Sequence, residues 1–448
     1  MTTSFTALPQ VSAIHLLMNR SVAKALFDVG ARLRNPSLPE EYRRLKESEF
    51  LPLSQLREIQ LTRLNALLSH AQSTSAFYRA RFQELDLRGQ NLRSLDDIRI
   101  VPVVDKASLI ANNVAIHSSK RTKYFVAETS GTSGVALEFR KSERWDSINR
   151  AHLMRAYSWY GVQPWDRNGY LWGYNISPRH HRKVKVLDTL QNRFRLFRYD
   201  EAEVTEFARR LTQARFVGGY SSMIYETAKI INRLGLRVEG LALVKGTSEM
   251  ILDVYQKEAQ AAFGRRITSE YGAAEAGLIA FECPSGSMHI NIEDVLLEVD
   301  QDGTAIVTNL ASDSFPVIRY RLGDSVVLAN EPCACGRAHP VLKEIAGRRG
   351  HSIVGWRARY PALTFYYVFK NLAITKGILL NYKATQAEVG RCTLTIEGQK
   401  AAIIEKEVRA EMYRYFADDL DYTIDYVDRF PAGLKKAQYF ESLISEGH

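Results

Sequence analysis

The chain has 448 residues, of which 46% are hydrophobic and 25% are charged, and its Lys and Arg residues outnumber Asp and Glu by ten. At about 150 residues per domain this length predicts roughly three folded units; the composition excludes a disordered chain, and four Cys are too few for a disulfide scaffold of this size. The positive charge suits an anionic partner such as a nucleotide, a nucleic acid or membrane headgroups, and its sign alone does not choose among them.

The N-terminal region is expected to be helical and to carry no secretory signal. Residues 1–33 mix charged and apolar positions and lack the compact apolar run of a secretory signal. No stretch approaches the roughly 18 apolar residues of a membrane span. With no export signal and few thiols, a cytoplasmic protein is expected. Apolar residues recur at helical spacing between Ser54 and Leu85, and residues 1–100 are therefore expected to form a mainly helical region. The apolar face consists of Leu56, Leu61, Leu64, Leu67, Leu68 and Ala71.

Short apolar runs alternate with capped helices between Ala214 and Tyr271, and a further capped helix is expected just upstream, from Asp200. Strands separated by helices of this length predict a parallel sheet with right-handed crossovers, and therefore an α/β fold for the body of the protein. The predicted strands are 214–219, 241–244 and 267–271.

After Tyr271 the pattern changes to strands alone, which is typical of an antiparallel or barrel-like subdomain. A small α+β domain is expected to follow, and its boundary is predicted at Gly347-Arg348-Arg349-Gly350, because two glycines give the backbone the freedom that a hinge needs. Within it, strands are expected in 376–397 and 422–428 and a helix in 403–416. The expected divisions are a helical region (1–100), a core (101–346) and a mobile C-terminal domain (347–448).

The densest basic run, Arg179-His180-His181-Arg182-Lys183-Val184-Lys185, has two interpretations. Charge runs are usually solvated, which predicts a surface loop. The alternative is a docking patch for a phosphate-bearing ligand. No zinc-finger or RNA-binding aromatic signature accompanies the run, so nucleic acid is the weaker partner.

Three segments offer groups that would bind a phosphorylated ligand. Thr129-Ser130-Gly131-Thr132-Ser133-Gly134 follows an apolar run, and its small residues allow backbone N–H groups to converge on phosphate oxygens. In Tyr271-Gly272-Ala273-Ala274-Glu275, the glutamate follows a predicted strand and offers a carboxylate to a divalent cation. Asp324 follows a predicted glycine turn and offers a carboxylate to both hydroxyls of a ribose. Taken singly, each segment also fits an ordinary turn or a surface carboxylate.

Cys283, His289, Cys333 and Cys335 form a set that suits zinc in number and type. Clustered cysteines in a reducing compartment more often bind metal than form disulfides. Five residues lie between Cys283 and His289, and 43 lie between His289 and Cys333, which is not the spacing of a standard zinc finger. Scattered buried thiols are therefore an equal alternative on spacing alone. Cys392 lies outside the set and is expected to be a core residue.

In this order, the segments resemble the adenylate-forming ligase superfamily and, within it, the phenylacetate–CoA ligase family, including its relatives from capsular polysaccharide loci. The resemblance covers nearly the whole chain, and so many segments in register are hard to explain by chance. The matching segments are LTRLNALLSHAQSTSAFYRARFQEL with VPVVDKASL, ETSGTSG, KGTSEMI, SEYGAAEAGLIAFEC, FPVIRYRLGD, CACGRAHP, IAGRR and PAGLKK.

The resemblance implies a two-step reaction. A carboxylate oxygen attacks the α-phosphate of ATP to give an acyl-adenylate and pyrophosphate, and a thiol, usually that of CoA, then displaces AMP. An aromatic acid is one candidate substrate. The implied roles are phosphate binding by Thr129, Ser130, Gly131, Thr132, Ser133 and Gly134, Mg²⁺ binding by Glu275, ribose binding by Asp324, an adenine and acyl pocket at Tyr271, Gly272 and Ala273, ribose or phosphate contact by Arg348, and adenylation by Lys436 or Lys435.

Similar Cys and His positions occur in some members of this family, which favours zinc for Cys283, His289, Cys333 and Cys335. Such a closed set of four ligands would be structural, and would hold the antiparallel subdomain beside Asp324 rather than supply the catalytic metal.

Three positions depart from the family pattern. Ala274 stands where Thr or Ser is usual, Gly350 and His351 stand where the hinge usually has an aspartate, and Gly433-Leu434-Lys435-Lys436 replaces the usual Gly-Lys pair. The transfer to a thiol is therefore less firmly expected than the adenylation. Two alternatives stay open: adenylyl or acyl transfer to a hydroxyl, amine or sugar, and a diverged non-catalytic binding or scaffold protein.

Overall fold

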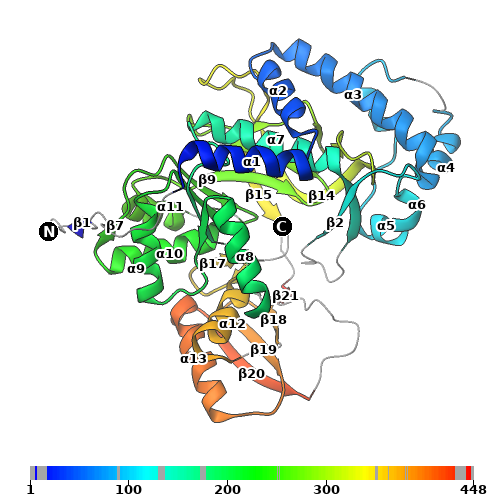
Figure 1. Ribbon diagram of the computed structural model, residues 1–448. Helices are drawn as coiled ribbons and strands as arrows, with labels where there is room; N and C mark the ends of the chain where they lie inside the picture. The colour runs from blue at the N-terminus through cyan, green and yellow to red at the C-terminus, as the bar shows by residue number, and fades with distance from the viewer. Residues whose placement is uncertain are drawn as a thin grey trace. The chain divides into compact units, whose positions relative to one another are not determined.

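The chain has the expected mixed α/β architecture and divides into two compact units (Figure 1). The second unit begins at Arg348 and also takes in Arg198–Asp200. The structure, a computed structural model, describes residues 6–7, 18–87, 91–129, 137–171, 178–249, 251, 253–348, 352–361, 363–378, 380, 382–428 and 440–444. None of the helices in these ranges is both long enough and apolar enough to cross a bilayer.

An 11-stranded sheet in the order β12-β13-β14-β15-β11-β10-β9-β8-β6-β4-β5 forms the centre of the first unit. The predicted parallel and antiparallel regions are therefore one continuous sheet, joined where β9 turns back into β10. The parallel strands are β4 (Asn168–Leu171), β5 (Arg193–Arg195), β6 (Phe216–Tyr220), β8 (Leu243–Thr247) and β9 (Thr268–Ala273). The remaining strands are β10 (Gly277–Glu282), β11 (Met288–Ile290), β12 (Val295–Val299), β13 (Thr304–Asn309), β14 (Val317–Leu328) and β15 (Val341–Arg348).

The three predicted parallel strands correspond to β6, β8 and β9, and the helices between them are present. The helices of this part are α8 (Pro178–Leu190), α9 (Glu201–Leu211), α10 (Ser221–Arg233) and α11 (Asp253–Phe263). The surface loop predicted for residues 179–185 is wrong, because this run lies within α8. Pro178 suits the first turn of a helix, and the Arg, Lys and Leu residues that follow are good helix formers with no glycine among them.

The N-terminal helices pack on the sheet and share its core. Leu64 and Tyr78 belong to the same buried cluster as Tyr271 and Tyr320. The helix predicted for 54–85 is interrupted at Ser75, whose extended backbone and hydroxyl, 3.4 Å from the Tyr78 amide, begin a second helix. The elements are α1 (Arg20–Arg34), α2 (Leu38–Ser48), α3 (Leu53–Thr74), α4 (Ala76–Glu84), the 3₁₀ helix η1 (Asp96–Ile100), α5 (Lys106–Ala111), α6 (Asn113–Ile116) and α7 (Glu143–Trp159).

Two short pairs of strands complete the first unit. β2 (Tyr124–Glu128) and β3 (Glu138–Ser142) form an antiparallel hairpin, and β1 (Thr6–Ala7) runs parallel to β7 (Leu236–Arg237).

The second unit is an α+β fold with a four-stranded sheet in the order β20-β19-β18-β21. The predicted helix at 403–416 and the strand at 422–428 are present, and Cys392 lies in the core as expected. A second helix at 363–376 was not predicted. The elements are β16 (Ser352–Val354), β17 (Arg359–Pro361), α12 (Leu363–Lys376), β18 (Tyr382–Glu388), β19 (Arg391–Glu397), α13 (Ala402–Phe416), β20 (Asp421–Val427) and β21 (Phe440–Ser442).

Candidate functional site

Glu275 lies in the three-residue turn that joins β9 to β10. Gly277 follows this turn with a φ of +78°, and a Cβ on Gly272 would lie 2.4 Å from the Gly277 carbonyl oxygen. Glycine is therefore required at both positions for the hairpin to close. Glu275 is only 2% exposed, so the alternative of a surface glutamate is wrong.

Two tyrosine hydroxyls connect this hairpin to β14. Tyr320 donates to Oε1 of Glu275 at 2.9 Å, and Tyr271 donates to Oδ2 of Asp324 at 2.9 Å. In addition, Nδ2 of Asn309 donates to the Glu275 carbonyl oxygen at 3.2 Å. Glu275 and Asp324 are far apart along the chain. Each nevertheless accepts a hydrogen bond from a tyrosine, and both hydrogen bonds join the β9–β10 hairpin to β14.

Asp324 lies within β14 and not after a turn, which corrects the sequence-based expectation. Gly323 has a φ of +89°, and the ladder between β13 and β14 shifts register opposite Thr304 to Ile306. An extra residue in one strand bends it and re-aims the neighbouring side chain, as β-bulges beside functional sites commonly do. The glycine therefore marks a bulge that directs Asp324 toward Tyr271.

The predicted phosphate-binding segment connects β2 to β3. The Thr129 amide donates to the Leu137 carbonyl at 3.0 Å, and the Thr129 hydroxyl accepts from the Leu137 amide at 2.9 Å, so this threonine closes the base of the connection. Leu137 belongs to the same buried cluster as Tyr271 and Ala276. Ser130, Gly131, Thr132, Ser133, Gly134, Lys435, Lys436 and the side chain of Arg348 lie outside the described residues.

Sequence reasoning missed an ion pair between the middle of β8 and the middle of β9, in which the lysine is buried and the glutamate partly buried. Nζ of Lys245 lies 2.7 Å from Oε2 of Glu270, and the Thr247 hydroxyl donates to Oε1 of the same carboxylate at 2.8 Å. Burial opposes the charged lysine, but the attraction of Glu270 outweighs burial and raises the pKa of Lys245 above its ordinary value. A lysine inside the apolar run LALVKGT is the signal that would have identified it.

The four predicted zinc ligands come together. Their donor atoms lie within 4.8 Å of one another, and Sγ of Cys335 is 3.1 Å from Nε2 of His289. The sulfurs of Cys283 and Cys333 are 3.7 Å apart, which is too far for a disulfide bond of about 2.05 Å. This separation matches the edge of about 3.8 Å in a tetrahedron with Zn–S bonds of about 2.3 Å. The alternative of scattered thiols is therefore wrong for these three cysteines.

The imidazole of His289 is oriented by a neighbouring carbonyl group. Its Nδ1 lies 3.2 Å from the carbonyl oxygen of His339, where it donates, so Nε2 keeps its lone pair for the cluster. Cys283 follows β10, His289 lies in β11, and Cys333 with Cys335 lies between β14 and β15. The cluster therefore connects β10, which follows the Glu275 turn, to the loop after β14, the strand that carries Asp324.

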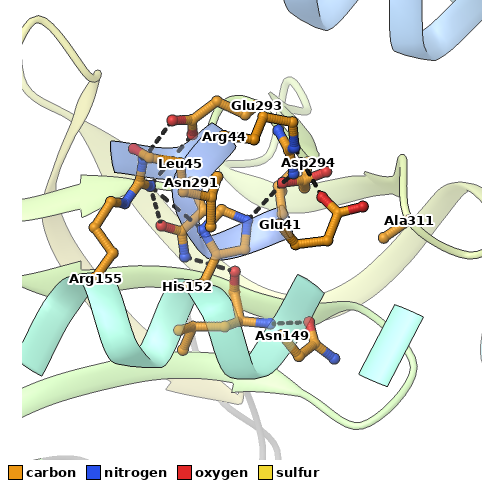
Figure 2. A network of polar contacts seen from close by, with 12 residues as sticks. Glu41, Arg44, Leu45, Asn149, His152, Arg155, Asn291, Glu293, Asp294 and Ala311 are labelled. Carbon is orange, nitrogen blue, oxygen red and sulfur yellow. Dashed lines mark hydrogen bonds and ion pairs between the residues drawn. The ribbon is translucent and has the colours of Figure 1, made fainter. Parts of the chain in front are cut away.

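A network of buried charges lies between the N-terminal helices and the sheet, as Figure 2 shows. Nε2 of His152 lies 2.7 Å from Oδ2 of Asp294, and Nη2 of Arg44 lies 2.7 Å from the same oxygen. Burial alone would raise the pKa of Asp294, but Arg63 and Arg44 outweigh burial and hold it far below its usual range. His152 is therefore part of a buried ionic core.

The same network reaches the strand that follows Glu275. Arg155 forms an ion pair with Glu293, and its Nη2 donates to Oδ1 of Asn291 at 2.9 Å. Nδ2 of Asn291 in turn donates to the Leu278 carbonyl at 2.9 Å, and Oδ1 of Asn149 accepts from the Leu278 amide at 3.4 Å (Figure 2). These contacts hold β10 three residues after Glu275.

Two known proteins are similar to this chain in sequence. No family model matches the chain. It is 25% identical over 324 residues to protein CapK of Staphylococcus aureus, covering 69% of this chain and 70% of that protein. It is 23% identical over 333 residues to phenylacetate-coenzyme A ligase of Thermus thermophilus, covering 69% of this chain and 74% of that enzyme.

Solved structures show the same fold. A 2-hydroxyisobutyryl-CoA ligase in the postadenylation state, in complex with 2-HIB-AMP, matches with a TM-score of 0.59 at 18% identity, over 89% of this chain and 91% of that chain. The same enzyme in the thioesterification state, with 2-HIB-AMP and CoA, matches with a TM-score of 0.56 at 17% identity, over 89% and 91%.

Proposed function

We propose that this chain, a member of the adenylate-forming ligase superfamily, activates a carboxylic acid with ATP and passes the acyl group to CoA. The observation that carries the proposal is the pairing of Tyr271 with Asp324 and of Tyr320 with Glu275 across the β9–β10 hairpin and β14. Two carboxylates fixed in this way suit the two polar ends of a nucleotide, one the ribose and the other the metal-bound phosphates.

Each residue has a defined part in the proposed reaction. Asp324 accepts hydrogen bonds from the ribose hydroxyls while Tyr271 fixes its carboxylate. Glu275 keeps one oxygen on Tyr320 and offers the other to Mg²⁺, a cation that prefers carboxylate ligands and that neutralises phosphate charge when bound. Most of the catalytic demand is charge handling, so groups held rigidly before the substrate binds are what the chemistry requires.

The remaining roles rest on the resemblance to the family. Under the proposal, an aromatic acid is one candidate substrate, and the C-terminal domain brings the adenylating lysine to the α-phosphate. The residues concerned are Ser130, Gly131, Thr132, Ser133 and Gly134 for the phosphates, Arg348 for ribose or phosphate, and Lys436 or Lys435 for adenylation.

Release of AMP from ATP, screened over a panel of acids with and without CoA, tests the proposal. We expect AMP release that depends on one class of acid and an acyl-CoA product when CoA is present. If products form only with a hydroxyl, amine or sugar acceptor, that acceptor would take the place of CoA in the proposal. Nucleotide binding with no AMP release for any acid would contradict an enzymatic role and favour a binding protein.

Asp324→Ala is expected to weaken ATP binding roughly 100-fold or more, because two hydrogen bonds to a charged acceptor are lost at about 1.5–3 kcal/mol each. Titration calorimetry with ATP and Mg²⁺ measures the change in Kd. Tyr271→Phe is the matched control, since it removes the donor that orients Asp324 but keeps the carboxylate, and we expect a smaller loss. An Asp324→Ala protein that binds ATP as tightly as wild type would disprove the ribose assignment.

We also propose that Cys283, His289, Cys333 and Cys335 hold a structural zinc ion. The donor set is three thiolates and one imidazole, the sulfur separation fits a tetrahedral site, and His339 orients the imidazole. With all four positions filled by protein ligands, the ion would stabilise the fold and not take part in the reaction.

About one equivalent of zinc per chain is expected, and Cys333→Ser should lose it together with thermal stability, since metal binding and folding are coupled. Elemental analysis and thermal melting of the purified protein measure both quantities. Cys392→Ala is the control, because that thiol lies in the core of the second unit and should leave the zinc content unchanged. Metal-free protein with an unchanged Tm would remove the zinc site.

A further inference from the structure

Helix α1 packs one side on the protein and exposes apolar residues on another. Its Phe27 ring lies 5.4 Å from the ring of Trp165, which fixes the buried side. The exposed residues recur at spacings of four, three and four, so they form one stripe along the helix, and they are between 37% and 75% exposed. They are Val22, Leu26, Val29 and Leu33.

Helix α8 also exposes apolar residues. Val186, Leu187 and Leu190 are between 44% and 60% exposed, and helical spacing places Lys183 on the same face one turn earlier. The two helices are in contact in the first unit (Figure 1). Asn192, just after α8, donates to the carbonyl of Trp165 at 3.2 Å, against which α1 packs. The seven exposed apolar residues of the two helices, together with the exposed Arg32, Lys183 and Lys185, form what we name the α1–α8 surface.

Basic residues are concentrated in the same two helices. Residues 20–34 and 178–190 contain eight Lys and Arg residues against two Asp, and so hold six of the ten net positive charges of the chain. Both aspartates are paired: Asp28 lies 2.6 Å from Lys24, and the buried Asp188 lies 2.8 Å from Arg195. Arg20 and Arg34 pair with Asp166 and Asp146 outside these helices, whereas Arg32, Lys183 and Lys185 are exposed and supply the positive charge of the α1–α8 surface.

We propose that the α1–α8 surface docks the protein on an anionic lipid bilayer. An exposed apolar stripe flanked by Lys and Arg is the signature of helices that lie in the plane of a membrane interface. Anionic headgroups attract such basic segments, and the apolar side chains then enter the acyl boundary. A second copy of the chain would bring two cationic surfaces face to face, which opposes self-association through this surface. The proposal is independent of the adenylation proposed above.

Co-sedimentation of the full chain with lipid vesicles tests this proposal. We expect binding to vesicles of phosphatidylcholine with phosphatidylglycerol, weak binding to phosphatidylcholine alone, and loss of binding as salt is raised. The triple variant Leu26→Ser, Val29→Ser, Leu33→Ser should bind the anionic vesicles about ten-fold more weakly or worse. Val114→Ser, which removes an 89% exposed apolar residue elsewhere, should bind as wild type does.

A second variant separates a docking defect from misfolding. Lys183→Glu with Lys185→Glu changes two exposed charges and no core residue, and should also weaken binding to anionic vesicles at an unchanged Tm. Equal vesicle binding by wild type and the triple variant would overturn the proposal. A second result would also overturn it: the wild-type protein binds no vesicles but forms a dimer in sedimentation, and the triple variant abolishes that dimer. This outcome would assign the surface to a second copy of the chain.

Discussion

Glu275→Gln is expected to lower the rate of acid-dependent AMP release by about 100-fold or more, with little change in Tm. Glutamine has the shape of glutamate and still accepts a hydrogen bond from Tyr320, so the β9–β10 hairpin should close as before. What it lacks is the negative charge that would hold Mg²⁺ against the phosphates. Steady-state rates at several Mg²⁺ concentrations measure the effect.

The matched control for this variant is Glu282→Gln on the same hairpin. Oε2 of Glu282 accepts from the Ser269 amide at 2.7 Å at the end of β10 away from Glu275, and burial raises the pKa of this carboxyl. We expect this control to keep most of its activity. A Glu275→Gln protein as active as wild type would remove the metal-binding role of Glu275.

Arg155→Met is expected to destabilise the protein by about 3–5 kcal/mol, because it leaves the buried Glu293 carboxylate without its main partner. Arg155 is 1% exposed and Glu293 is fully buried, and their attraction, together with that of His339, overcomes burial and holds the pKa of Glu293 well below its usual range. Urea unfolding followed by tryptophan fluorescence measures the change.

The double variant Arg155→Met, Glu293→Gln provides the internal control. Replacing the Glu293 carboxylate together with Arg155 should recover part of the lost free energy of unfolding. The loss in the single variant arises from the unpaired buried carboxylate and not only from the missing ion pair. Unchanged unfolding of Arg155→Met would show that the network in Figure 2 does not stabilise the fold.

The parts of the fold that could be predicted from sequence are those with a local signal. β6, β8 and β9 are parallel strands covered by helices, so they appear as short apolar runs between caps and glycines. Helix 363–376 has aromatic and aliphatic residues on nearly every side, which hides the helical period. The break at Ser75 depends on one cap inside an otherwise continuous apolar pattern.

For the candidate site, the carboxylates and zinc ligands could be predicted from sequence, but the residues that hydrogen-bond to the carboxylates could not. Glu275 and Asp324 stand in recognisable segments, whereas Tyr320 and Asn309 bond to Glu275 only because β13 and β14 return to the hairpin from far along the chain. The zinc ligands were identifiable by their chemistry. Their convergence follows from the pairing of β10 with β11, in which Phe281 lies opposite His289, and such register depends on long-range packing that one sequence does not reveal.

Exchange of labelled pyrophosphate into ATP is the measurement that most directly tests whether Tyr271, Glu275 and Asp324 serve one ATP molecule. It reports reversal of the adenylation step alone, without any need for CoA or knowledge of the final acceptor. With Mg²⁺ and a panel of acids, we predict exchange with at least one acid in the wild-type protein, and its loss in both Asp324→Ala and Glu275→Gln. Exchange that persists unchanged in both variants would contradict a shared site, and its absence in the wild type for every acid would contradict adenylation itself.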